Sequence, residues 1–218
     1  MKRIIVTCML VAFVITGMAG IASAHEMKGK DDGKMMHSKA SVDLKMAMRK
    51  LWEEHIVYTR NYIISALADL PDGGKIAERL IQNQVDIGDA IKPYYGDAAG
   101  AKLTALLKDH IIIATEVVKA AKMGDNAALG AASAKWEANG VDIATFLSGA
   151  NPNWPKQTLA DMMHKHLELT TGEVVSRLKK DWAADISYYD KGHDHILMMA
   201  DALTDGIVKQ FPDKFKKK

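Results

Sequence analysis

The chain has 218 residues, of which 48% are hydrophobic and 26% are charged, with 16 Gly, 5 Pro and a single Cys. This composition excludes collagen, low-complexity disorder, a disulfide scaffold and a zinc or iron–sulfur site built on cysteines. The formal net charge is only +2, so we expect neither nucleic acid nor an anionic membrane surface as a partner.

The first 24 residues have the layout of a secretory signal. Lys2 and Arg3 precede an apolar run over residues 4–21, and residues 22–24 (Ala-Ser-Ala) are the small residues that a signal peptidase reads. We therefore expect cleavage before His25 and a periplasmic or secreted protein without stable membrane insertion after cleavage. An uncleaved membrane anchor is the alternative.

Residues 25–40 are polar, contain Gly and show no periodicity, which is typical of a flexible tail. The segment contains two His and three Met, which are His25, His37, Met27, Met35 and Met36. Because imidazole and thioether groups bind copper, the tail is a candidate copper site of low affinity. A solvated linker without a metal is the alternative.

From residue 41 onward, apolar residues recur at spacings of three and four, which predicts an all-α fold. Segments that contain Gly, Pro, Asp or Asn interrupt this pattern and set the expected helix ends. The sequence predicts a bundle of six helices, over 41–70, 75–95, 101–122, 126–148, 156–179 and 182–210. A short basic tail at 212–218 follows the helical domain, which we place at 41–211.

Three segments of the chain match one another at a period of about 56 residues. LWEEHIVYT, LLKDHIIIA and MMHKHLELT place His55, His110 and His166 at equivalent positions, and a second set consists of Asn83, Asn139 and His195. The pattern predicts three pseudo-repeated antiparallel hairpins, over 42–97, 98–153 and 154–211. A chance match between short helical patterns is the alternative.

The two sets of residues are expected to meet at mid-height in each hairpin. Each residue is about 14 positions from its turn, or roughly 21 Å along the helix axis. Both sets also follow the apolar stripes of their helices, so we expect them in the interior. An unpartnered imidazole or amide there costs about 1–3 kcal/mol or more, so partners must exist. Three hairpins closed around one axis would place all six groups in one polar layer.

Two interpretations of this layer remain open. Neutral imidazoles suit copper, zinc or iron, so the first is a site for a metal ion or small ligand, with the candidate metal ligands His55, His110, His166 and His195. Further candidate binding residues, some of which would orient the rings, are Asn83, Asn139, Asp86, Asp142 and Glu173. The second interpretation is structural, with each His bonded to the Asn opposite to fix hairpin register in an interaction module.

A hydrolase or transferase that uses His with Asp or Glu is a third possibility. However, the sequence contains no nucleophile elbow, P-loop or Rossmann glycine pattern, and it lacks the Glu-x-x-His pairs of di-iron bundles. An enzyme is therefore the less favoured class, and we assign no catalytic residue.

The runs LWEEHIVYTRNYIISALADLPD, RLIQNQVDIGDAIKPYYGDAAG and LTDGIVKQFP carry a resemblance over most of the chain after the signal. They resemble a family of exported bacterial all-helical proteins whose members bear inconsistent names, including glycosyltransferase. The resemblance implies export and a helical fold, and it carries over no activity and no residue role. The sequence has no acidic metal motif beside a strand, so it does not support the glycosyltransferase name.

Overall fold

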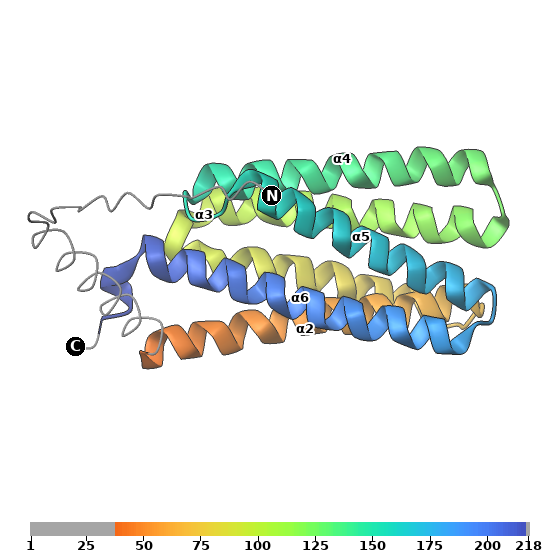
Figure 1. Ribbon diagram of the computed structural model, residues 1–218, viewed down its shortest axis with the longest axis horizontal. Helices are drawn as coiled ribbons and strands as arrows, with labels where there is room; N and C mark the ends of the chain where they lie inside the picture. Colours follow the sequence, from red (N-terminus) through yellow and green to blue (C-terminus); the bar gives the residue numbers. More distant parts are fainter. Residues whose placement is uncertain (1–37, 217–218) are drawn as a thin grey trace, which may run out of the picture.

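Five α-helices packed as a bundle make up the computed structural model, which describes residues 38–216 (Figure 1). The helices are α2 Lys39–Leu67, α3 Gly73–Met123, α4 Asn126–Ala150, α5 Lys156–Leu178 and α6 Trp182–Gln210, and a 3₁₀ turn, η1 Pro212–Lys214, follows. The all-α prediction is confirmed. None of the helices within 38–216 is both long and apolar enough to cross a bilayer. The expected cleavage before His25, and the copper-ligand candidates His25 and His37, lie outside the described residues.

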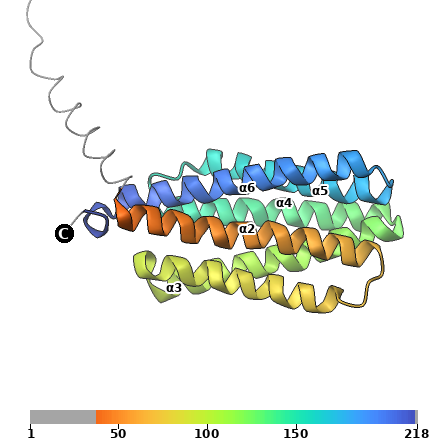
Figure 2. The same ribbon diagram turned by 90° about the horizontal axis from the view of Figure 1, so that it is seen from below.

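The prediction of six helices is wrong, because 75–95 and 101–122 are two arms of one element, α3, with no loop between them. Its only non-helical residue is Gly96, with φ 83° and ψ 169°. This conformation is essentially restricted to glycine. The chain reverses at this one residue and resumes helical structure at once, whereas the expected helix bounds left a connection over 96–100. Figure 2 shows the two arms of α3, 73–95 and 97–123, running antiparallel to each other.

The two arms of α3 pack at unusually close range. A Cβ atom at Gly88 would lie 1.9 Å from Thr104 Oγ1, and one at Gly100 would lie 2.5 Å from Lys92 Cγ. Small residues therefore permit the tight reversal. The helices then close into a ring, in which α3 contacts α2 and α4, α6 contacts α2 and α5, and α4 contacts α5.

The bundle has two distinct ends (Figure 1). At the turn end lie the connections over 68–72, 124–125 and 179–181, and at the connector end lie Gly96, the segment 151–155 and η1. The turn end is defined by local chemistry: Asp125 and Asp181 accept backbone N–H bonds from the first turns of α4 and α6, at 2.9 and 3.1 Å. Gly124 ends α3 in the left-handed conformation.

The core differs between the two ends. The half toward the connector end, here called the apolar half, contains one large cluster of buried hydrophobic residues, among them Met48, Trp52, Ile87, Ile91, Leu103, Leu107, Ile143, Leu147, Leu203 and Ile207. The half toward the turns, here called the turn half, contains two small clusters, one around Trp136 and Leu167 and one around Ile63, Val118 and Val174. The buried histidines lie in the turn half, at its boundary with the apolar half.

Candidate functional site

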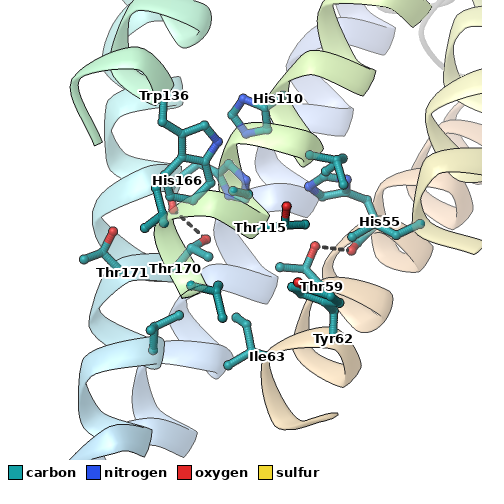
Figure 3. A pocket seen from close by; sticks show the side chains of 16 residues that line it. His55, Thr59, Tyr62, Ile63, His110, Thr115, Trp136, His166, Thr170 and Thr171 are labelled. Carbon is teal, nitrogen blue, oxygen red and sulfur yellow. Dashed lines mark hydrogen bonds between the residues drawn. The ribbon is translucent and has the colours of Figure 1, made fainter. Parts of the chain in front are cut away.

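Three histidines from three helices converge in the middle of the bundle. His55 on α2, His110 on the second arm of α3 and His166 on α5 are only 2–3% exposed. The ring centre of His166 lies 5.6 Å from that of His55 and 5.9 Å from that of His110. Figure 3 shows the three rings around a shared space. We call His55, His110 and His166 the three-histidine cluster.

The cluster forms the floor of an internal cavity that extends into the turn half. Its free volume is about 20 Å³, which is the room that a single water molecule needs. The remaining wall is made of apolar side chains together with Tyr62, Trp136 and four threonines, which are Thr59, Thr115, Thr170 and Thr171. Within the described residues, the side chains that line this cavity include no Asp, Glu, Lys or Arg.

Asn139 fixes the tautomer of His110. The Asn139 amide nitrogen donates to the backbone carbonyl of Leu106 at 3.1 Å, which turns its Oδ1 toward His110 Nδ1 at 2.7 Å. Since an amide oxygen only accepts, His110 carries its proton on Nδ1 and leaves a lone pair on Nε2. Asn139 therefore presents His110 as a neutral ring with a free nitrogen.

His55 has a different partner from the one that the sequence suggested. The nitrogen nearest to its Nδ1 is Nε2 of Gln84, at 3.3 Å, and this amide also donates to Leu80 O and to Asn83 Oδ1. Asn83 itself donates to the carbonyl of Leu51 at 2.9 Å. Asn83 thus holds Gln84, and Gln84 contacts the imidazole.

The cluster contains buried polar atoms that lack hydrogen-bond partners. Within residues 38–216, no partner satisfies His110 Nε2, His166 Nδ1 or Trp136 Nε1. Trp136 packs against His110 with ring centres 5.3 Å apart. Leaving such groups unsatisfied in the interior costs about 1–3 kcal/mol each, so the three that line this cavity make it a candidate binding site.

Burial keeps the three imidazoles neutral. Desolvation, with a smaller contribution from the neighbouring His110, lowers the pKa of His55 to about 3. Desolvation lowers the pKa of His110 to about 4, against the bond to Asn139. The pKa of His166 is held well below 6.5 by burial first, and then by the charges that His55, His110 and His195 would carry. A neutral imidazole is the form that binds metal ions.

Three equivalent hydrogen bonds tie the polar layer to the backbone. Each runs from a residue of the second set to the carbonyl four residues before a buried His: Asn83 to Leu51, Asn139 to Leu106 and His195 to Met162, at 2.9, 3.1 and 2.8 Å. In the third case the acceptor is a carbonyl, so His195 Nε2 carries the proton. These bonds link α2 with the first arm of α3, the second arm with α4, and α5 with α6.

Several sequence-predicted site residues lie away from the cavity. His195 is outside its wall and directs Nε2 to Met162. Asp142 is exposed on α4, and Asp86 accepts from Gln82 at 3.0 Å on the outer side of α3. Helical spacing placed both aspartates one turn from an amide but could not show that this turn rotates them away from the rings. They do not orient the imidazoles.

Glu173 is buried, but its partner is Arg60 and not a ring. Arg60 Nη1 lies 2.7 Å from Glu173 Oε1 and 2.6 Å from Asp185 Oδ1, and Arg177 Nη1 lies 2.9 Å from Asp185 Oδ2. Desolvation raises the pKa of Glu173, and at Asp185 the bonds from Arg60 and Arg177 outweigh desolvation and lower the pKa. Two cations and two anions thus form a neutral network beside the cavity.

Sequence reasoning missed Gln84, Arg60, Trp136, Thr115 and Thr171 as parts of the site. Helical spacing placed two further threonines beside the rings, because Thr59 and Thr170 follow His55 and His166 by one turn. Their hydroxyls donate to the carbonyls of those two residues at 2.8 and 2.9 Å (Figure 3). No comparable signal marked Gln84, since its neighbour Asn83 matched the repeat.

The rings do not form a finished metal site as they stand. Among the described residues, no three His, Cys, Asp or Glu side chains are arranged to hold a metal ion. Two imidazoles that share one ion at ~2.1 Å have ring centres about 5–6 Å apart. The 5.6 and 5.9 Å separations fall within this range.

Comparison of this chain with family models, curated proteins and solved structures found no match. The resemblance to a family of exported helical proteins is therefore not supported by any of the three comparisons. What the chain shares with that expectation is its all-helical fold.

Proposed function

We propose that this protein binds one transition-metal ion in the cavity of the three-histidine cluster. The observation that carries the proposal is the pair of buried ring nitrogens, His110 Nε2 and His166 Nδ1, that have no partner among the described residues. Both rings line the same cavity and both are neutral at physiological pH. With its proton on Nε2, His166 offers a lone pair at Nδ1, and a ligand that accepts two lone pairs then satisfies both atoms.

The size and the chemistry of the cavity favour a metal ion over an organic ligand. About 20 Å³ admits one ion or one water and excludes a sugar, nucleotide or amino acid. Imidazole binds copper, zinc and iron. His55 is the third ligand in this proposal, and its coordination through Nε2 would require the Gln84 amide to turn its oxygen toward Nδ1.

Metal analysis of tag-free protein tests the proposal. We expect about one more ion per chain in the wild type than in His166→Gln, because any copper bound by the tail is common to both. The matched control is His164→Gln, because His164 is exposed on the same helix and contacts Glu137 at 3.1 Å. Metal at a hundredfold excess over its dissociation constant should stabilise the wild type and the control by about 2.7 kcal/mol. Equal metal content in His166→Gln and the wild type would contradict the proposal.

The three side-chain bonds to Leu51, Leu106 and Met162 favour a second candidate, a structural layer that fixes the register of three pseudo-repeated hairpins. The two candidates differ in the metal-free protein. A structural layer requires His110, whose loss orphans Asn139 Oδ1 at a cost of about 1–3 kcal/mol. It does not require His166 Nδ1, which has no partner to lose within 38–216. Metal binding requires both residues.

Export and a copper-binding tail complete the proposal. The basic start, apolar run and Ala-Ser-Ala of residues 22–24 support periplasmic or secreted location, and mass measurement of the processed chain should give a start at His25. A retained Met1 would contradict cleavage. Copper titration of the wild type and of a His25→Ala, His37→Ala double variant tests the tail, and equal stoichiometry would exclude it.

A further inference from the structure

The wall of the cavity carries no charge of its own to balance a bound ion. Within the described chain, its lining consists of three neutral imidazoles, hydroxyls and apolar groups. The nearby carboxylate of Glu173 is neutralised by Arg60, and the whole network of Arg60, Arg177, Glu173 and Asp185 has as many positive as negative groups. An ion in this cavity would therefore keep its full charge in a medium of low dielectric constant.

That environment discriminates between ions by charge. The free-energy cost of moving an ion out of water rises with the square of its charge, so the cost for a divalent ion is about four times that for a monovalent ion of similar size. Sites for Zn²⁺ and Cu²⁺ offset this cost with thiolate or carboxylate ligands, or with an open water-filled position. The three-histidine cluster offers none of these ligands.

The number of available ligands points the same way. Zn²⁺ requires four ligands, whereas Cu⁺ and Ag⁺ are stable with two or three nitrogen donors. The two unpartnered ring nitrogens, with His55 as a third donor, supply this lower number. Trp136, whose ring lies 5.3 Å from that of His110, adds a polarisable aromatic surface to the same wall.

We propose that the cavity of the three-histidine cluster selects a monovalent soft ion, Cu⁺, for which Ag⁺ is the redox-inert probe, over Zn²⁺ and Cu²⁺. This inference rests on the proposed metal-binding function and narrows it to one class of ion. The full chain is titrated with Ag⁺ in chloride-free buffer and, separately, with Zn²⁺ and Cu²⁺. Long-range ¹H–¹⁵N correlation spectra of the imidazoles report which ring nitrogens bind.

We expect one equivalent of Ag⁺ to shift the His110 Nε2 and His166 Nδ1 resonances, with an affinity at least about 100-fold tighter than that of Zn²⁺ at the same nitrogens. His110→Gln removes both shifts, and the exposed control His164→Gln retains them. The spectra of the wild type identify the bound nitrogens even if a variant fails to fold. The tail residues His25 and His37 have their own resonances, so binding there is distinguished from binding in the cavity.

The possible outcomes separate the two proposals. If Zn²⁺ or Cu²⁺ shifts the cluster resonances with equal or tighter affinity than Ag⁺, selection of a monovalent ion is overturned and metal binding stands. If no ion shifts the resonances of His110 or His166, or if shifts are confined to the tail, both proposals are overturned.

Discussion

The interiors of the two halves of this bundle are filled in different ways. The apolar half contains one large hydrophobic cluster, with two internal gaps of only about 10 Å³ each. The turn half contains three buried imidazoles, a cavity of about 20 Å³ and a buried ion network. Burial of apolar area stabilises the first half, whereas the second carries groups that lower stability unless a partner is present. The contrast separates a half that stabilises the fold by apolar burial from a half that contains the candidate site.

Acidification should give the largest loss of stability, because it acts on the buried imidazoles of the turn half. The unfolded chain binds protons at its imidazoles below pH 6.5, while folded His55 and His110 stay neutral down to about pH 3 and 4. The stability that depends on keeping these rings neutral is therefore fully present above pH 6.5 and is lost as the pH falls toward 4. The free energy of unfolding should fall by about 1.4 kcal/mol per pH unit for each such imidazole.

Urea unfolding of metal-free protein at intervals between pH 7 and pH 4.5 measures this slope. In His166→Gln, which has one buried imidazole fewer, the change in the free energy of unfolding per pH unit should be smaller by the contribution of one imidazole. In His164→Gln, where the residue is exposed, it should be unchanged. A stability that does not vary over this range would show that the rings are already charged in the folded protein and would remove the contrast between the halves.

Loss of the buried ion network should have the next largest effect. Arg60→Met removes the cation shared by Glu173 and Asp185, whose side chains are each only 2% exposed. Removal of one partner from a buried pair costs about 3–5 kcal/mol, because the remaining charges are left uncompensated. Chemical denaturation at pH 7 measures the loss.

Arg49→Met is the matched control for this change. Arg49 bonds Asp201 at 2.7 Å, but the arginine side chain is 45% exposed and the aspartate 24%. A pair of this kind contributes about 0–1 kcal/mol. Equal losses in the two variants would mean that the turn half does not depend on its buried charges.

The sequence specified the helix ends at the turn end more accurately than the reversal at the connector end. Periodicity and breakers placed α6 at 182–210 and the last turn of α5 within one residue of Leu178. The reversal in α3 was expected in the right region, but the sequence could not show that one glycine suffices for it. A Gly with positive φ lets the chain reverse and helical structure resume at the next residue, and no composition rule distinguishes this from a loop.

The candidate site was only partly predictable for a related reason. The match of three segments at a spacing of about 56 residues predicted that His55, His110 and His166 belong to one site, and the structure brings these three rings together. It also brought forward His195, Asp86 and Asp142, which the structure places elsewhere. Sequence spacing gives the height of a residue along a helix, but the rotation of its side chain depends on how neighbouring helices pack. Gln84 and Arg60 could not be predicted for the same reason, because only tertiary packing brings them to their partners.

The smallest effect, and the sharpest test of the comparison, comes from one chemical change made in both halves. Ile87 and Ile63 are each 1% exposed, but Ile87 belongs to the apolar cluster and Ile63 lines the cavity. Ile87→Ala leaves a void that apolar neighbours cannot fill and should cost about 2–5 kcal/mol. Ile63→Ala enlarges a cavity that already holds unpartnered polar atoms, so water can enter and the cost should lie at the lower end of that range. The two variants should also differ in Ag⁺ affinity, with the larger effect now at Ile63. Ile87→Ala should leave the affinity at the wild-type value, and Ile63→Ala should weaken it because water then competes for the ring nitrogens. Thermal denaturation and Ag⁺ titration of the two variants side by side measure both quantities. Equal effects on stability and on affinity would show that the two halves are one continuous core, and that the cavity is a packing defect and no site.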